Sequence, residues 1–463
     1  MAVEPIRLPG EELSNEARRI AAETESPAQR APTPILPVIA KSAGVFHWTP
    51  EGRRIYDYTS GTLVANLGHN HAEWLRALMN YMGWNASPRM DEPLPATPLT
   101  ATHAVTILEA QASRRLLANL QSKPGGKRLE RVLWATTGSD AAHKALRAAL
   151  AFDPGREIIV ATRGGSHGNK GLAESVSGDE SSPHRDPRVR FVSFPRQECM
   201  DITLRDSPFD PAPYRAELES LAANPGGSRI ACLITEPYLG IGSFHPPRAY
   251  LQSLQEFCRK TGALFILNES QSNFGRTGQM FAFRTYGIEP DLLILSHGLG
   301  NGIAASCVAG RSDVLSALPP AEAADTFSAN PLACAAVLAT LDVFERRNIL
   351  KYARRASDII EEGLLRLKEI PFVRYVRGEL GGMIWCLEIG DFGGRPAEAV
   401  ASACVLAAYR GDEKGRAVHL EGPLAGRMIR IAPPLVITTD EAQDSLDALY
   451  DCFKSVEREL APK

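Results

Sequence analysis

The chain has 463 residues, of which 44% are hydrophobic and 23% are charged, and its formal net charge is −3. This length allows two or three domains, and the near-neutral charge gives no electrostatic basis for binding nucleic acid or an anionic membrane. No apolar run approaches the roughly 20 residues of a membrane helix, and the N-terminus does not read as a secretory signal. We therefore expect a cytoplasmic enzyme-like protein.

The eight cysteines are scattered through the chain and form no CxxC pair. Most of them lie in apolar runs, which predicts buried, reduced thiols rather than disulfides or metal sites. The ten histidines show no HExxH or similar zinc pattern. The sequence therefore predicts no metal site.

The first half of the chain predicts an arm followed by alternating strands and helices. Residues 1–37 are polar and proline-containing, and we expect an N-terminal arm on the surface. Residues 38–75 read as short strands and turns that belong to a smaller domain. Beyond them, helical segments alternate with brief, nearly continuous apolar runs, at 131–136, 158–161, 229–235, 263–267 and 292–295. Such runs are typical of strands buried on both faces of a mostly parallel sheet, so residues 76–330 are predicted to form a large α/β domain.

The last third predicts a smaller α+β domain over residues 331–463. A long helix over 330–347 and a second helix come first, then paired strand-like runs over 372–390. A helix near 398–409, a strand at 428–432 and a final helix follow. Thr438 and Glu441 have capping-box spacing at the start of that last helix.

Two turns have the character of anion-binding sites. Thr137, Gly138 and Ser139 stand between a predicted strand and a predicted helix, where free backbone N–H groups and the helix dipole suit a phosphate. The same turn is also an ordinary helix cap. Residues 325–331 form a polar loop that enters a helix, and read alone they are a helix start with an early proline.

Arg430 lies in an apolar strand, and a buried guanidinium needs a partner. A substrate carboxylate gripped by the planar fork would serve. A structural salt bridge would serve equally, and the sequence leaves both open.

Taken together, motifs along the chain from about Tyr56 onward resemble those of class III aminotransferases, which have fold type I and use pyridoxal phosphate (PLP). The motifs occur in the family's order: LGHNH (67–71), TTGSDAAHKA (136–145), SHGNKG (166–171), TEPYLGIGSFHPPRAYL (235–251), LFILNESQSNFGRTGQMFAF (264–283), DLLILSHGLGNGIAASCVAGR (291–311), TFSANPLACAA (326–336) and RIAPPLVIT (430–438). DYTSG (57–61) and RIAPPLVIT are somewhat similar to the dialkylglycine decarboxylase branch.

The resemblance implies roles for particular residues. Thr137, Gly138 and Ser139 are similar to the family's phosphate-binding turn, and Thr326 to the phosphate ligand that the neighbouring subunit of a homodimer donates. The remaining matches are Gln271 near the cofactor's phenolic oxygen, the active-site glutamate Glu236, and Arg430 as ligand of an amino-acid or keto-acid carboxylate.

Three departures from the family pattern stand out. The Schiff-base lysine position carries His297, which can shuttle protons but cannot form the iminium. The aspartate that keeps the pyridine nitrogen protonated is replaced by Asn268. The aromatic residue that stacks on the ring, just before His167, is replaced by Ser166. The covalent link to the cofactor, the charge beside its ring nitrogen and the stacking on its ring are therefore all changed. This favours a natural lineage whose pocket has diverged.

Three functions remain open from the sequence. The first is an enzyme that binds PLP, or its amine form PMP, non-covalently and uses His297 and Glu236 in catalysis. The second is a catalytically silent relative that serves as a binding or regulatory subunit. The third is a cofactor-independent enzyme that uses the old phosphate site for a phosphorylated substrate.

Overall fold

The computed structural model describes residues 5–85, 94–223 and 229–462. Contacts within the chain divide it into two compact units. Unit 1 is made of residues 1–71 and 351–463, and unit 2 of residues 72–350. The domain limits expected from the sequence, at residues 37, 75 and 330, stay predictions.

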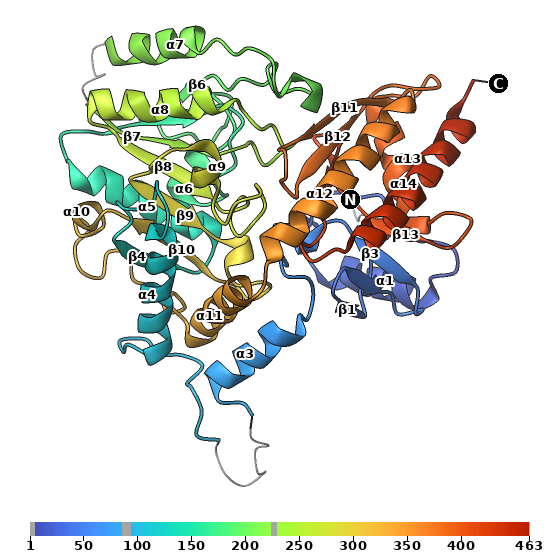
Figure 1. Ribbon diagram of the computed structural model, residues 1–463, viewed down its shortest axis with the longest axis horizontal. Coiled ribbons are helices and arrows are strands. Elements are labelled where there is room, and N and C mark those ends of the chain that lie inside the picture. Colours follow the sequence, from blue (N-terminus) through green and yellow to red (C-terminus); the bar gives the residue numbers. More distant parts are fainter. Residues whose placement is uncertain (1–4, 86–93, 224–228, 463) are drawn as a thin grey trace. The chain divides into compact units, whose positions relative to one another are not determined.

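Unit 2 is built on a seven-stranded sheet in the order β4-β10-β9-β8-β7-β5-β6 (Figure 1). Its strands are β4 (Arg131–Ala135), β5 (Ile158–Thr162), β6 (Val189–Val192), β7 (Ile230–Thr235), β8 (Leu264–Glu269), β9 (Leu292–Leu295) and β10 (Ser306–Gly310). β10 is antiparallel to β4 and β9, and the strands from β9 to β6 are mutually parallel. The prediction of a mostly parallel α/β sheet is confirmed.

Because all strands of this sheet except β10 share one direction, the carboxyl ends of β4, β5, β7, β8 and β9 meet at one edge. The helices of unit 2 are α3 (Ala72–Met82), α4 (Ile107–Gln121), α5 (Gly138–Phe152), α6 (Gly171–Ser175), α7 (Ala212–Ala223), α8 (Arg248–Thr261), α9 (Ala282–Tyr286), α10 (Ser312–Leu315) and α11 (Pro331–Arg346).

The α5 helix is fixed on the sheet by an alanine stripe. Ala141, Ala145 and Ala148 recur at helical spacing, are fully buried and belong to the same core as Ile266 and Ile294 of the sheet. Small side chains let the helix backbone lie close to the strands. The first turn of α5 is thereby held at the edge where the strands end.

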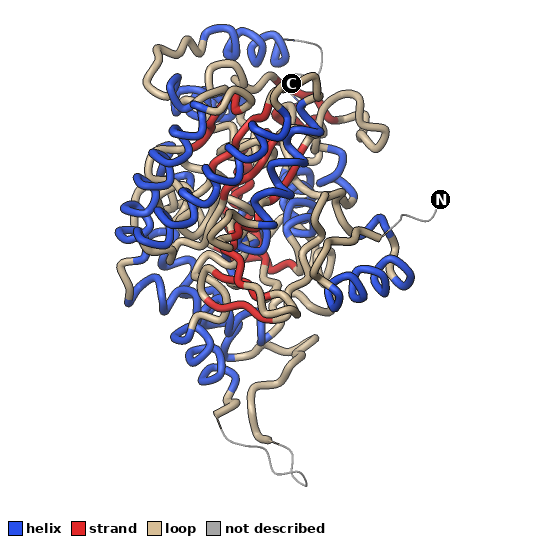
Figure 2. The backbone as a smooth tube through the Cα atoms, turned by 90° about the vertical axis from the view of Figure 1, so that its right-hand side faces the viewer, coloured by secondary structure: helices blue, strands red, loops and turns tan. Residues whose placement is uncertain are grey.

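Unit 1 contains two four-stranded sheets, in the orders β1-β2-β3-β13 and β11-β12-β15-β14. Figure 2 colours all strands of the chain red and its helices blue. The strands are β1 (Lys41–Ala43), β2 (Phe46–Trp48), β3 (Arg54–Asp57), β11 (Val373–Gly378), β12 (Trp385–Ile389), β13 (Ala417–His419), β14 (Glu421–Leu424) and β15 (Met428–Ile431). The helices are α1 (Glu12–Thr24), α2 (Ser60–Leu63), α12 (Ile349–Arg366, which begins at the unit boundary), α13 (Ala397–Arg410) and α14 (Thr439–Leu460).

Several expectations for unit 1 are confirmed and one needs correction. The paired runs near residues 372–390 form the antiparallel pair β11–β12, and Thr438 and Glu441 make a complete capping box on α14. The N-terminal segment, however, is not only a surface arm. It contains α1, whose Arg18 is buried and forms an ion pair of 2.6 Å with Glu11.

All eight cysteines are buried and unpaired with one another, as the sequence predicts. Among the described residues, no helix combines the length and the apolar character that spanning a bilayer requires.

Candidate functional site

The site residues predicted in unit 2 gather at the edge where its parallel strands end. Thr137 follows β4, Ser166 lies beyond β5, and Glu236 follows β7. Asn268 lies in β8 opposite Ile294 of β9. Gln271 and His297 each come two residues after their strands end. In open α/β sheets this edge is where ligands bind.

The α5 helix begins directly at this edge. The backbone N–H of Asp140 donates to the Thr137 hydroxyl at 3.1 Å, so Thr137 caps the helix. A Cβ placed on Gly138 would lie 3.2 Å from Ser270 Oγ and 3.4 Å from Ser296 Oγ. The turns that follow β8 and β9 therefore both reach the first turn of α5, and His297 is the residue after Ser296 in the second of these turns.

The loop after β5 also packs on the start of α5. Asn169 N–H donates to Ser139 Oγ at 3.3 Å. Gly168 has φ 130°, and a Cβ there would overlap with Ser139. A glycine is required for this close approach. We call Thr137, Gly138 and Ser139 the cradle, since the helix N-terminus there presents N–H groups and a positive dipole end to an anion.

Asn268 is held at both ends of its amide. Ser270 donates its backbone N–H (3.0 Å) and its hydroxyl (2.6 Å) to Asn268 Oδ1, which fixes the oxygen side. The Nδ2 group then donates to His167 Nδ1 at 3.1 Å. Burial lowers the pKa of His167 to about 3, so its ring is neutral and can accept this bond. Residue 268 therefore brings a neutral amide, and no negative charge, to this edge of the sheet.

Glu236 and Gln271 lie beside this group. The backbone N–H of Ser166 donates to Glu236 Oε2 at 2.8 Å, and Glu236 is buried. Gln271 Oε1 is buried against Gly240 and has no hydrogen-bond partner among the described residues. A buried amide oxygen without a donor carries an energetic cost, and a bound ligand at this edge would relieve it.

His297 has a strained backbone. It begins the short 3₁₀ helix His297–Leu299 and has φ 42°, in the left-handed region. Asn273 Nδ2 donates to the Ser296 carbonyl at 3.0 Å, and the Ser296 and Ser306 hydroxyls are bonded at 2.8 Å. The surrounding bonds therefore hold a conformation that costs about 1–3 kcal/mol, which is a common feature of functional positions.

Two residues that the sequence did not single out help to build the site. Glu269 is fully buried, and its carboxylate accepts the backbone N–H groups of Ala282 (2.7 Å) and Phe283 (2.6 Å), which joins β8 to α9. Burial raises the pKa of Glu269 to about 7. Lys144 is also buried, and its ammonium donates to Asp325 at 2.6 Å. Lys144 lies within the buried alanine stripe of α5, and this position in the sequence could have indicated that the lysine is buried.

The two remaining predicted residues, Thr326 and Arg430, make other contacts. Thr326 is exposed, and its carbonyl accepts a hydrogen bond of 3.2 Å from Thr102. Arg430 belongs to unit 1, where it is buried and ion-paired with Glu421 at 3.1 Å. The structural salt bridge foreseen for Arg430 is therefore present, and a role toward a substrate carboxylate stays a prediction.

Comparisons with known proteins agree with this architecture. A family model described as aminotransferase class-III matches residues 28–453. The chain is 30% identical over 420 residues to a 2-aminoadipate transaminase of Pseudomonas putida, a match covering 88% of this chain and 93% of that protein. It is 27% identical over 417 residues to a probable 4-aminobutyrate aminotransferase of Bacillus subtilis, covering 88% and 91%. An amine transaminase from an uncultivated Pseudomonas species, solved in a PLP-bound form, has a TM-score of 0.76 at 25% identity and covers 98% of this chain and 100% of its own. The chain therefore belongs to the class III aminotransferase family and shares its fold-type-I architecture.

Proposed function

We propose that this protein binds PLP or PMP non-covalently at the carboxyl edge of the unit 2 sheet and acts on an amino-acid or keto-acid substrate. His297 then stands where the family has its covalent lysine. The observation that supports the proposal is the closeness of Ser296 Oγ to the Cβ position of Gly138, because His297 is the residue that follows Ser296 in the chain.

The residues present fit such a cofactor. The cradle would hold the phosphate, with the hydroxyl of Ser139 as an added donor. Gln271, whose buried oxygen lacks a protein partner among the described residues, would contact the ring's polar substituent. The Asn268–His167 pair would lie toward the ring nitrogen, and Glu236 behind Ser166. When bound, PLP or PMP supplies an electron-withdrawing ring that weakens bonds at the substrate α-carbon.

In this proposal His297 is the proton carrier. An imidazole can accept a proton from carbon and return it near neutral pH. It cannot replace the covalent link that a lysine amine makes, so the cradle and the ring contacts must retain the cofactor. Glu236, which accepts the Ser166 N–H, positions the loop that forms one side of the site.

Asn268 supports a second candidate, a catalytically silent subunit. Its amide is held by Ser270 and His167, and it brings no negative charge to keep a pyridine nitrogen protonated. With that charge missing, the ring is a weaker electron sink. A protein of this kind would keep the cradle for binding a phosphorylated ligand and would not turn over amino acids.

Binding at the cradle tests the proposal first. We expect PMP and PLP to bind, and Ser139→Ala combined with Thr326→Ala to weaken both by about 5- to 150-fold, which corresponds to about 1–3 kcal/mol for lost charge-assisted bonds. Isothermal titration measures this, with Ser207→Ala, an exposed serine elsewhere in unit 2, as the control. Equal affinity in the double variant and the control would show that the cradle is only a helix cap.

A further inference from the structure

Strand register in unit 1 puts an unusual set of side chains on one face of the β1-β2-β3-β13 sheet. Ser42 pairs with His47, His47 pairs with Ile55, and His419 pairs with Asp57. Asp57 comes two residues after Ile55 and so points to the same face. The row Ser42, His47, Asp57 and His419 therefore crosses four strands.

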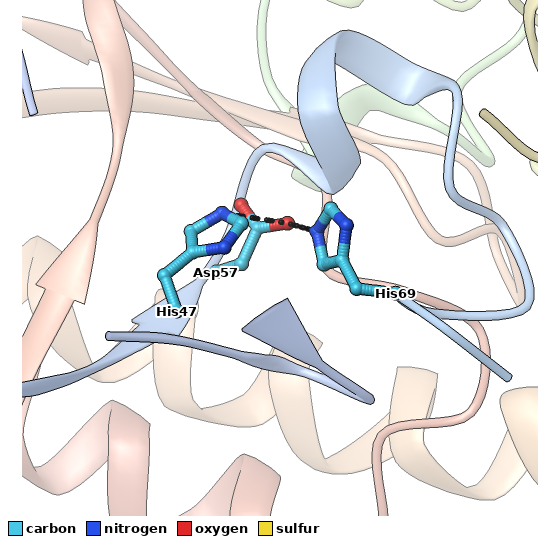
Figure 3. A group of neighbouring side chains, drawn as sticks. All are labelled: His47, Asp57 and His69. Atoms are coloured by element: carbon cyan, nitrogen blue, oxygen red, sulfur yellow. Dashed lines mark hydrogen bonds and ion pairs between the residues drawn. The ribbon is translucent and has the colours of Figure 1, made fainter. Parts of the chain in front are cut away.

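A third histidine reaches this row from a loop. His69 is anchored by a two-bond bridge to Gly44, in which each backbone N–H donates to the other residue's carbonyl at 2.8–2.9 Å. His69 Nε2 lies 2.7 Å from Asp57 Oδ2, and His47 Nε2 lies 3.5 Å from the same oxygen. Figure 3 shows the two imidazoles on either side of the carboxylate.

The charges in this group call for a cation. Asp57 is fully buried, and a buried carboxylate must be paired. One protonated imidazole would be enough for an ion pair. Here two imidazole nitrogens converge on one carboxylate oxygen, and His419 Nδ1 lies 3.9 Å from the other. His419 Nδ1 is buried and makes no hydrogen bond within the described chain.

We propose that His47, Asp57 and His69, with His419 as a fourth ligand, form a binding site for a zinc ion in unit 1. The ligand atoms of the first three lie within 4.8 Å of one another. Ligands at about 2.0–2.1 Å from a tetrahedral zinc are separated by roughly 3.3 Å. The distance from Asp57 Oδ2 to His47 Nε2 is 3.5 Å, and that to His69 Nε2 is 2.7 Å, so the His69 ring would draw back from the carboxylate when the ion binds. Two or three imidazoles with one carboxylate are ligands that suit zinc.

The supporting contacts are those of a metal centre. His47 Nδ1 is bonded to Ser42 Oγ at 2.8 Å, which turns Nε2 toward Asp57. Asp57 Oδ1 accepts the N–H (2.8 Å) and hydroxyl (2.7 Å) of Thr59, which leaves Oδ2 for a metal. Such outer contacts fix the ligand orientation in zinc proteins. The side chains of His69 and His419 are 18% and 20% exposed, so an ion can enter from that side.

A metal here would tie the two ends of the chain together, because His47, Asp57 and His69 come from the N-terminal part of unit 1 and His419 from its C-terminal part. The sequence pattern did not predict a metal site, since strand pairing and not a local motif assembles the ligands. The inference concerns unit 1 only and does not depend on the proposed function of unit 2.

Zinc binding by the full chain tests this inference. After equilibration with zinc and dialysis, we expect about one tightly held zinc per chain by mass spectrometry of the metal content. X-ray absorption at the zinc edge should show only nitrogen and oxygen ligands, near 2.0–2.1 Å, with imidazole scattering. The cobalt-substituted protein should show the strong visible bands of four-coordinate cobalt.

Variants identify the ligands. His69→Gln should weaken zinc binding at least about 100-fold, since losing even a second-shell partner costs about 10- to 100-fold. His184→Gln, whose side chain is 65% exposed in unit 2, should bind as the parent does. Zinc held equally by His69→Gln, sulfur in the absorption spectrum, or no zinc retained would overturn the proposal. If His69→Gln does not fold, the absorption spectrum of the unaltered protein decides alone.

Discussion

His297 combines a strained backbone with a titratable ring, and the two properties can be separated by mutation. Asparagine tolerates positive φ about as well as histidine, so His297→Asn should keep the backbone at φ 42° and remove only the proton carrier. We expect exchange of amino-acid α-protons into D₂O, with PLP added, to fall about 10²–10⁴-fold. NMR on a panel of α-amino acids measures it.

The matched control for this variant is His103→Asn, which replaces an exposed histidine that also has positive φ, 63°. Its exchange rate should equal that of the parent. Unchanged exchange in His297→Asn would assign the proton transfer to another group, and no exchange in the parent would favour the silent subunit.

At single residues, the sequence predicted which positions follow the strands of unit 2 but not the contacts that these residues make. The resemblance placed Asn268 and Gln271 at the end of β8, and the structure has them there. It could not show that Ser270 and His167 hold the Asn268 amide, because hydrogen bonds between loops depend on packing that no linear pattern encodes. The buried Lys144 was missed because lysines in helices are usually solvated.

Lys144 joins two elements of the site. Its ammonium donates to Asp325 (2.6 Å), Ser328 (3.0 Å) and the Trp134 carbonyl (3.0 Å), and so links α5 to the loop that carries Thr326. Lys144→Met keeps the length and removes the donors. We expect a loss of about 1–3 kcal/mol in unfolding free energy, because the hydrogen bonds of a charged, buried ammonium are removed. Amide hydrogen exchange at 325–328 should become faster.

Lys260→Met provides the comparison for this change, because Lys260 lies on α8 and its side chain is 67% exposed. Its ion pair within the described part of the chain is with Glu256, one turn earlier on the same helix. It should leave both measurements within error. An exchange pattern at residues 325–328 that does not differ between the two variants would mean that the loop is held by other contacts.

Whole elements were predicted where burial imposes a pattern. The strands β4, β5, β7, β8 and β9 appear as short apolar runs because helices or loops cover the sheet, and these predictions are confirmed. β10 (SCVAG) was not predicted, since its small residues give little signal. α1 was missed because it is mostly polar, and its buried Arg18 depends on an ion pair with Glu11, which precedes the helix.

At the scale of the whole molecule, we predict a homodimer. Thr102 bonds to the Thr326 carbonyl and Asn330 to the Leu99 carbonyl, so two segments of unit 2 lie side by side. They carry four large apolar side chains that are more than half exposed: Leu99, Val105, Ile107 and Phe327. Clustered exposed apolar side chains mark an interaction surface, and the neighbouring subunit would cover them.

Sedimentation velocity at micromolar concentration should therefore give a dimer, and Ile107→Asp combined with Phe327→Asp should shift it to monomer. Leu380→Asp, at an exposed leucine of unit 1, should leave the dimer intact. A monomeric parent protein would contradict the prediction that Thr326 serves a neighbouring subunit.

Retention of the cofactor without a covalent link is tested most directly by borohydride reduction of the protein with PLP, followed by peptide mass spectrometry. Borohydride fixes PLP to any amine with which it has formed a C=N bond. We predict no pyridoxyl group on the site peptides of the parent protein and a labelled residue 297 in His297→Lys. A pyridoxyl group on a lysine of the parent's site, such as Lys144, would contradict non-covalent binding.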